Sequence, residues 1–327
     1  MKTFLGATPD RLTIALIVGA VILICVILYM YPAAWLDVFT PEAFKYRTKS
    51  SYTSGAQIAS SNGIVICGLV RDAEDSIPRI IRQVEDLGRL FREYRVFILE
   101  NDSEDRTREK LLEWAKHNEN VTVLGCGVNQ EMCRLDLAKT ERQKIYPSRM
   151  KKMAMLREEL REAVQSLHDQ NADFERIVGR PRFPFTAMWD FDLEGVLYHD
   201  GIMSSLLALE NTSYTGICAN GIRPLLGGHL YYDTLAHRES TEPLDIRMKA
   251  AHDLRIGLGG FSESDGIVPV SSCFGGFALY NTKAFVDATY LSLRSDPLEC
   301  EHTTLSRSDS IKTAVNAKMR HLVLHNP

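Results

Sequence analysis

Two features that would point to common functional classes are missing from this chain of 327 residues. None of its seven cysteines is followed by a second cysteine with two residues between them, so the ligand spacing of structural zinc sites is absent. The chain also has no run of basic residues, and its formal net charge of −4 provides no general attraction to nucleic acid. A structural zinc module or a nucleic-acid partner is therefore not expected.

Charged residues are missing from one long segment near the N-terminus. Residues 12–30 are uncharged and about long enough to cross a bilayer as a helix. Lys2 and Arg11 precede this segment, and aromatic residues cluster at its other end, as is usual at a membrane interface. A cleaved signal peptide is the alternative, although no small-x-small site follows closely. The sequence predicts four segments: a cytoplasmic tail (1–11), a transmembrane anchor (12–31), a flexible polar stem (32–62) and a catalytic domain (63–327).

The six cysteines outside the anchor leave the redox state open. They would permit disulfides in a lumenal compartment. Cys67 and Cys273, however, lie in apolar, strand-like runs, where a reduced buried thiol is equally expected. Three sequences are formal N-glycosylation acceptors, at Asn101, Asn120 and Asn211.

The apolar pattern after residue 63 predicts alternating strands and helices. Continuous apolar runs, typical of strands covered on both faces, occur at four places: 64–70, 96–99, 121–124 and 185–189. Apolar residues at helical spacing predict helices at three places: 77–90, 107–117 and 153–167. This order implies right-handed crossovers. We therefore expect an α/β fold with a mostly parallel, Rossmann-like central sheet flanked by helices.

Two aspartates follow the last of these apolar runs. In an extended segment residues i and i+2 point to the same side, so Asp190 and Asp192 can face one cleft while Phe191 packs the other way. Carboxylate oxygens are ligands that Mg²⁺ and Mn²⁺ prefer, so this pair can hold a divalent cation and, through it, a diphosphate. A solvated turn or a helix cap is the alternative.

Charged residues also follow the ends of the other predicted strands. Ligands of open α/β sheets bind beyond the carboxyl ends of the strands. Four residues besides the aspartate pair are expected at this edge: Arg71, Asp72, Glu100 and Asp102. Their coincidence favours a binding site over loop solvation, although Asp102 or Ser103 can instead cap the next helix.

Six short motifs follow one another along the chain: Arg71-Asp72, Glu100-Asn101-Asp102-Ser103, Asp190-Phe191-Asp192, Tyr232-Asp233-Thr234, Ser272-Cys273-Phe274-Gly275-Gly276-Phe277 and Cys300-Glu301-His302. In this order they resemble GT-A glycosyltransferases, and more closely the fungal capsule-associated α-1,3-mannosyltransferase family. The resemblance covers about Gly63 to the C-terminus. It implies a GT-A fold, a nucleotide-sugar donor, Mn²⁺ or Mg²⁺, and a type II membrane protein of the Golgi or endoplasmic reticulum with a lumenal catalytic domain.

The resemblance places several residues at the donor. Arg71 and Asp72 match the loop that lines the nucleotide pocket, and Glu100 or Asp102 matches the acidic position that contacts base or ribose. Arg149, like Arg142, can grip phosphate oxygens through its guanidinium, although a surface position is the commoner one for such a residue. Because glycosylation of Asn101 would obstruct this pocket, we expect that acceptor to stay bare.

Other matches concern the metal and the acceptor. Asp190 and Asp192 match the metal-binding pair, so Asp190 is also expected to contact the donor, and His302 is a candidate further ligand. Glu301 matches the acidic position near the acceptor. It can act as a base if the reaction inverts configuration, or position the acceptor if configuration is retained, as the resemblance implies. Asp233 and its neighbour Tyr232 suit a bound sugar: the carboxylate can contact its hydroxyls, and the aromatic ring can pack on its C–H faces. Each of these residues has a packing or capping alternative.

The expected activity is transfer of a sugar to a glycan acceptor. Mannose from GDP-mannose is the first expectation, and a UDP-sugar is possible. A metal-dependent phosphohydrolase or nucleotidyltransferase would also use paired carboxylates at strand ends, with Glu194, His199 and Asp200 nearest for a second metal. A non-catalytic carbohydrate-binding relative is the third hypothesis.

Overall fold

The computed structural model describes residues 18–22, 49–125, 147–225, 228–240, 249–262, 265–291 and 300–324. The chain divides into two compact units, Met1–Arg47 and Thr48–Pro327. Of the first unit only residues 18–22 are described, as a short helical segment with exposed side chains. The rest of the predicted anchor (12–31) and the predicted tail (1–11) lie outside the described residues. Within the described ranges, no helix is both long enough and apolar enough to cross a membrane.

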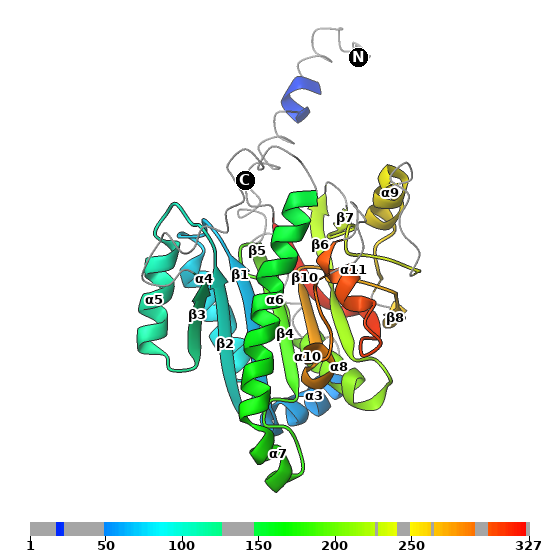
Figure 1. The fold of residues 1–327 in the computed structure, drawn as a ribbon. Coiled ribbons are helices and arrows are strands. Elements are labelled where there is room, and N and C mark those ends of the chain that lie inside the picture. Colours follow the sequence, from blue (N-terminus) through cyan, green and yellow to red (C-terminus); the bar gives the residue numbers. More distant parts are fainter. Residues whose placement is uncertain are drawn as a thin grey trace, which may run out of the picture. The chain divides into compact units, whose positions relative to one another are not determined.

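The second unit contains a ten-stranded sheet with the order β3-β2-β1-β4-β9-β6-β10-β5, in which β7 also pairs with β6 and β8 with β10 (Figure 1). The strands are β1 (Gly63–Val70), β2 (Glu93–Glu100), β3 (Val121–Gly125), β4 (Phe185–Asp190), β5 (Glu194–Leu197), β6 (Gly216–Leu225), β7 (Gly228–Tyr231), β8 (Ile267–Pro269), β9 (Phe277–Asn281) and β10 (Thr313–Leu324). All four strands expected from continuous apolar runs are present, as β1 to β4.

The sheet is mixed rather than mostly parallel. Strands β3, β2, β1 and β4 are parallel, as predicted. Strand β9 is antiparallel to both β4 and β6, and β10 is antiparallel to β5 and β8 although parallel to β6. The expectation of a mostly parallel sheet was therefore wrong for this half. Antiparallel neighbours need no helical crossover, and a continuous apolar run says that a strand is buried without giving its direction.

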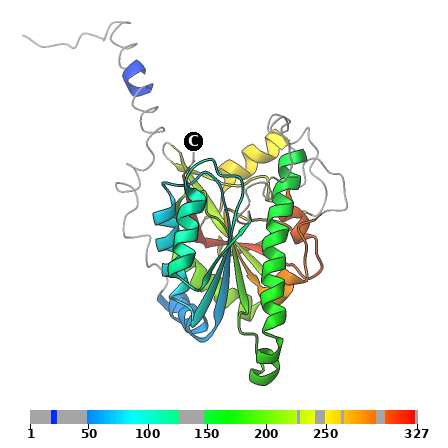
Figure 2. The ribbon, with the colours of Figure 1, turned by 60° about the vertical axis from the view of Figure 1, so that its left-hand side comes forward.

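Helices cover both faces of this sheet (Figure 2). Their buried residues belong to two separate hydrophobic clusters, one on each face. The first face carries α3 (Lys49–Ser61), α4 (Ile77–Gly88), α5 (Thr107–His117) and α8 (His199–Asn211). The second carries α6 (Pro147–Gln170), α10 (Thr282–Val286) and α11 (Glu301–Ser306). Of two further helices, α7 (Ala172–Val178) lies next to α6, and α9 (Lys249–Gly259) lies next to β7.

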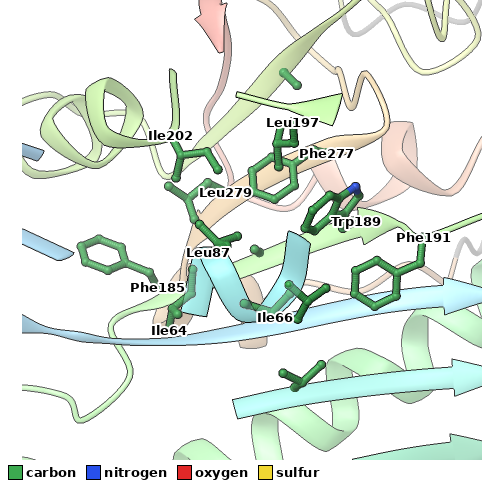
Figure 3. Close-up of a cluster of buried hydrophobic side chains, with 14 of the residues drawn as sticks. Ile64, Ile66, Leu87, Phe185, Trp189, Phe191, Leu197, Ile202, Phe277 and Leu279 are labelled. Atoms are coloured by element: carbon green, nitrogen blue, oxygen red, sulfur yellow. The ribbon is translucent and has the colours of Figure 1, made fainter. Parts of the chain in front are cut away.

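Alternation along β4 sends its side chains to these two faces in turn. Phe185 and Trp189 lie in the first cluster (Figure 3), whereas Met188 lies in the second. Phe191 continues the first set, and its ring meets that of Trp189 edge-on with centroids 5.4 Å apart. Because the period is two, Asp190 is directed to the opposite face, which α6 covers.

Helix α3 occupies part of the segment predicted to be a flexible stem. Its Ala59 is fully buried, and Tyr52 and Ile58 pack against the first cluster. A Cβ added at Gly55 would lie 2.0 Å from the carbonyl oxygen of Met203, so this glycine allows α3 to approach α8 closely. The compact unit thus begins at Thr48 instead of Gly63, while the earlier part of the predicted stem lies outside the described residues.

The structure distinguishes the cysteines for which both states were open. Cys218 of β6 and Cys273 form a disulfide with a Cα–Cα distance of 5.9 Å. Cys67 and Cys300 are buried free thiols. The disulfide therefore ties the segment before β9 to a central strand of the sheet.

Candidate active site

Asp190 and Asp192 lie at the carboxyl end of β4. The backbone N–H of Asp190 donates to the carbonyl oxygen of Gly276 at 3.0 Å, which ties this strand end to the turn before β9. The next N–H, of Phe191, donates to Leu69 O at 3.2 Å, and the chain then turns as Leu193 N–H donates to Asp190 O at 3.3 Å. The pair is therefore placed at the strand edge where the sequence predicted it.

A buried arginine joins Asp190 to Glu301. The side chain of Arg157, on α6, is 2% exposed. Its Nη2 donates to Asp190 Oδ1 at 2.6 Å, and its Nε donates to Glu301 Oε1 at 3.0 Å. Burial opposes the charge of this guanidinium, but the two carboxylates more than offset that effect and raise the pKa of Arg157. Asp190 and Glu301, which are far apart in sequence, thus both bond to the guanidinium of Arg157.

Asp233 approaches the same place from the loop after β7. It adopts a left-handed backbone conformation with a φ of 70°. Its Oδ2 accepts the backbone N–H of Gly275 at 3.2 Å, and its Oδ1 accepts that of Ala236 at 3.4 Å. Burial, followed by the charges of Asp190 and Glu301, raises the pKa of Asp233 to about 8. This carboxyl group therefore belongs to the same electrostatic cluster.

The cluster contains more carboxylates than cations. We call Asp190, Asp192, Asp233 and Glu301 the acidic cluster, and Arg157 is the buried cation among them. Burial and the charge of Asp190 raise the pKa of Asp192 to about 7. A group of oxygen ligands with excess negative charge fits a hard divalent cation, which would neutralise part of that charge.

His302 does not complete a metal site in this structure. Its ring is 3% exposed and stacks on the ring of Phe274, with centroids 3.7 Å apart. Among the described residues neither ring nitrogen has a hydrogen-bond partner, and burial lowers the pKa of His302. The described ranges also contain no group of three or more histidine, cysteine or acidic side chains arranged to hold a metal ion. The predicted set of Asp190, Asp192 and His302 is therefore not assembled, because the imidazole packs against the aromatic ring.

Glu100 is used within the chain. It is 2% exposed, its Oε1 accepts the backbone N–H of Ser103 at 2.8 Å, and its Oε2 accepts Arg108 Nη1 at 3.1 Å. The neighbouring Asn101 is 7% exposed, and its Oδ1 has no hydrogen-bond partner in the described part of the chain. An amide so deeply buried is poorly placed for glycosylation, in line with the expectation that this acceptor stays bare.

Asp102 and Asp72 also have partners within the chain. Asp102 accepts Lys152 Nζ of α6 at 3.0 Å. Asp72 accepts the backbone N–H of Glu104 at 2.7 Å and pairs with Arg71 Nε at 3.1 Å. A hydrogen bond therefore joins the loop after β1 to the loop after β2, and β1 is the neighbour of β4 in the sheet. Arg71, in the first of these loops, is partly exposed.

Two arginines were predicted near the donor phosphates. Arg149 is exposed in the first turns of α6, and its charge lowers the pKa of Asp192 against the larger effects of burial and Asp190. Arg149 therefore lies close enough to Asp192 for the two charges to interact. Arg142 falls outside the described residues.

Arg157 was missed in the sequence. The apolar residues at helical spacing that predict a helix over 153–167 are Met153, Leu156, Leu160, Val164 and Leu167. Arg157 is four residues after Met153 and three before Leu160, so it occupies a position of the stripe that these residues form. An arginine on the buried face of a helix needs a buried carboxylate partner, and this is the signal that could have revealed it.

His321 lies behind the acidic cluster. Its ring is 1% exposed, and Nδ1 lies 3.1 Å from the carbonyl oxygen of Gly275. Burial lowers the pKa of His321 to about 4, although Gly275 and Asp190 oppose this shift. His237, also buried, has its pKa lowered to about 4 by burial. Both rings are neutral in the folded protein above that pH.

These two histidines predict a loss of stability in mild acid. Each gains a proton near pH 6.5 when unfolded but only near pH 4 when folded, so unfolding is favoured as the pH falls through this window. The full effect of one such shift is roughly 3 kcal/mol. Urea denaturation at pH 7 and pH 5 should show a smaller loss for His237→Gln than for the wild type. His117→Gln, at an exposed position, is the control and should behave as the wild type. Equal losses in all three proteins would contradict this account.

The chain belongs to the family described as cryptococcal mannosyltransferase 1, a glycosyltransferase family whose match covers residues 63–314. The family resemblance predicted from the six motifs is thereby confirmed. No curated protein matches the chain in sequence.

Several solved structures are similar to this chain at low identity. The mannosyltransferase PcManGT from Pyrobaculum calidifontis, solved in complex with GDP-Man and Mn²⁺, is 10% identical with a TM-score of 0.44, over 86% of this chain and 68% of its own. S. aureus TarS 1–349 is 10% identical with a TM-score of 0.42, over 80% of this chain and 60% of its own. Its complex with UDP-GlcNAc gives 9% identity and a TM-score of 0.42, with 81% and 60% covered. The chain therefore spans about 60% of the TarS chain.

Proposed function

We propose that this protein is a metal-dependent glycosyltransferase that moves a sugar, mannose in the first instance, from a nucleoside-diphosphate donor to a glycan acceptor. The acidic cluster at the carboxyl end of β4, gathered around a buried arginine in a chain of a mannosyltransferase family, is the observation that carries this proposal.

Asp190 and Asp192 are the residues that would hold Mn²⁺ or Mg²⁺. Oδ1 of Asp190 is held by Arg157, so Oδ2 is the oxygen that Asp190 would present to the cation. A bound divalent cation stabilises the negative charge that develops on the leaving diphosphate. The proposal is supported by the excess of carboxylates, because a site without a cation would keep several like charges close together.

The donor base and ribose would lie over the loops after β1 and β2. Oxygens of Glu100 and Asp102 are already engaged by groups of the chain, whereas the buried Oδ1 of Asn101 has no such partner among the described residues. Asp102 is the most exposed of these residues, with a side chain 25% exposed, and is therefore the best placed to contact a base or ribose. Arg71 and Arg149, both at least partly exposed, would approach the phosphates.

The acceptor would lie between Glu301 and Asp233. Glu301 Oε1 is fixed by Arg157, and both oxygens of Asp233 accept backbone N–H groups. Carboxyl groups held in this way can orient sugar hydroxyls. If the transfer inverts configuration, Glu301 would accept the proton of the acceptor hydroxyl; if it retains configuration, Glu301 would orient that hydroxyl.

We further propose that residues 12–31 anchor the protein as a type II membrane protein, with the catalytic unit in the lumen of the Golgi or endoplasmic reticulum. The uncharged segment supports the anchor. The Cys218–Cys273 disulfide supports a lumenal position, because disulfides persist in oxidising compartments.

A donor panel tests the activity. The purified full-length chain is incubated in detergent with Mn²⁺, a mannose-terminated oligosaccharide acceptor and either GDP-mannose or a set of UDP-sugars. Release of the nucleoside diphosphate and extension of the acceptor are measured together. We expect turnover to be highest with GDP-mannose, to fall more than tenfold in EDTA, and to return with added Mn²⁺.

Other outcomes of the panel separate the rival functions. Release of phosphate from the donor without extension of the acceptor would favour a hydrolase. Binding of the oligosaccharide with no turnover of any donor would favour the carbohydrate-binding relative. Sugar transfer that is unaffected by EDTA would contradict the role of a metal.

A further inference from the structure

We infer that Arg157 is a positioning residue for sugar transfer: its guanidinium sets the placement of Glu301, on the acceptor side, relative to Asp190, on the donor side. This inference rests on the proposed function and deepens it, because it names the group that would hold the donor side and the acceptor side of the site at a fixed relative position.

The contacts of Arg157 have the geometry that such a role needs. The two carboxylates are bonded by different nitrogens, Nε for Glu301 at 3.0 Å and Nη2 for Asp190 at 2.6 Å. Guanidinium nitrogens lie in one rigid plane, so the angle between these two bonds is fixed by the side chain itself. Asp190 ends β4 and Glu301 begins α11, and α6 carries the group that joins them.

The surroundings hold this guanidinium in place. Its Cζ lies over the ring of Phe274, 4.7 Å from the centroid, and Phe274 in turn stacks on His302. Phe274 belongs to the turn that the Cys218–Cys273 disulfide fixes to β6. The packing of His302 therefore has a use different from metal binding: it supports the ring on which Arg157 rests.

Stability alone does not explain an arginine at this position. Neighbouring positions of the same stripe carry Leu160 and Val164, both buried and apolar. Within the described ranges Nη1 of Arg157 is buried and has no hydrogen-bond partner, so the guanidinium is only partly satisfied. A buried ion pair is often no more stabilising than an apolar residue of similar volume, and an unsatisfied donor makes it less so. A fold that keeps such a group is expected to use it.

Arg161 supplies a matched control one turn further along α6. Its side chain is 13% exposed, its Nε pairs with Glu158 at 2.8 Å, and its Nη1 donates to the carbonyl oxygen of Val286 at 2.8 Å. It thus resembles Arg157 in burial and in having a carboxylate partner, but its partners are not part of the acidic cluster.

The experiment compares Arg157→Lys, Arg157→Gln and Arg161→Gln in the full-length protein. Four quantities are measured: thermal stability, Mn²⁺ affinity by electron paramagnetic resonance of the free ion, KM for the donor and kcat. Lysine keeps the charge but cannot hold two carboxylates at a fixed angle. We expect kcat to fall roughly 10²-fold in both Arg157 variants, because small displacements of reacting groups have effects of this size. In Arg157→Lys, Mn²⁺ affinity and KM for the donor should stay within about threefold of the wild type, since the cation-binding pair and the neighbouring positive charge both remain.

Arg161→Gln should keep kcat within about twofold at a comparable loss of thermal stability. A double-mutant cycle completes the test: if Arg157 acts through Glu301, Arg157→Gln combined with Glu301→Gln should lower kcat no further than the more severe single variant. Wild-type kcat in Arg157→Lys, or equal kcat losses in Arg157→Gln and Arg161→Gln, would overturn the inference while leaving the proposed function intact. A wild-type protein that turns over no donor would overturn both.

Discussion

Replacing Asp192 by asparagine is expected to lower kcat of sugar transfer by roughly 10²–10³-fold, which is the scale of removing one group that stabilises developing charge. Asparagine keeps the shape of the side chain but removes one of the two carboxylates proposed to hold the cation. The loss should be accompanied by a higher Mn²⁺ concentration for half-maximal activity. Kinetics over a range of Mn²⁺ concentrations measure both quantities.

The same substitution should not destabilise the protein. Burial and the charge of Asp190 raise the pKa of Asp192 to about 7, which means that its ionised form is disfavoured in the folded state. An aspartate whose pKa is raised on folding lowers stability increasingly as the pH rises above its unfolded value near 4. In the metal-free protein at pH 8, Asp192→Asn is therefore expected to have a thermal stability equal to or above that of the wild type.

Asp200→Asn is the matched control for Asp192→Asn. Asp200 lies in the first turn of α8, and burial likewise raises the pKa of its side chain, whose Oδ1 accepts the N–H of Gly201 at 2.9 Å. It was also one of the residues considered for a second metal, so the variant tests the hydrolase alternative. Its kcat should stay within about threefold of the wild type. An equal loss in both variants would contradict the assignment of the cation to the end of β4.

Removing the Cys218–Cys273 disulfide is expected to have the largest effect on stability. The two cysteines are separated by 55 residues, and closing a loop of this length contributes about 4 kcal/mol in the chain-entropy account. For a unit of this size the melting temperature should fall by roughly 10 °C in the variant with alanine at both positions. Calorimetry measures this shift.

Activity should be lost with the disulfide because of what the turn after Cys273 holds. Gly275 and Gly276 adopt φ values of 67° and 79°, which side chains rarely tolerate. Gly275 N–H donates to Asp233, and Gly276 O accepts the N–H of Asp190. A turn freed from β6 therefore loosens two members of the acidic cluster, and we expect kcat at 20 °C to fall at least tenfold.

Cys67→Ala is the control for this experiment. Cys67 is a fully buried free thiol in the second hydrophobic cluster, so its replacement removes volume without breaking a cross-link. It should retain kcat within about twofold. A double-alanine variant of Cys218 and Cys273 that melts within 2 °C of the wild type and keeps full activity would show that the disulfide supports neither fold nor site.

The parallel half of the fold was predictable because burial on both faces leaves a clear sequence pattern. The runs at 64–70 and 185–189 correspond to β1 and β4, and the helix predicted over 107–117 is α5 (Thr107–His117). The direction of β9 was not predictable, since Phe277–Asn281 is as apolar as a parallel strand. Helix α3 was missed because small residues such as Gly55 and Ala59 mediate its packing, and they give no apolar periodicity.

The positions of the candidate site residues could be predicted where local geometry decides them, and could not where tertiary packing decides them. The positions of Asp190 and Asp192 follow from a strand end and a period of two. The environment of His302 depends on Phe274, which lies in a distant segment, and the stacking of these rings could not be read from the motif around Glu301. Arg157 was overlooked because its partners, Asp190 and Glu301, come from two other elements.

The central claim is that Asp190 and Asp192 bind a divalent cation that holds the donor diphosphate. Crystals of the protein grown with GDP and Mn²⁺ test it most directly, through an anomalous difference map collected near the manganese absorption edge. We expect a single strong peak within about 2.3 Å of a carboxylate oxygen of the pair and of a diphosphate oxygen, a distance suited to a hard cation with oxygen ligands. GDP bound at this edge with no anomalous peak beside Asp190 or Asp192 would contradict it.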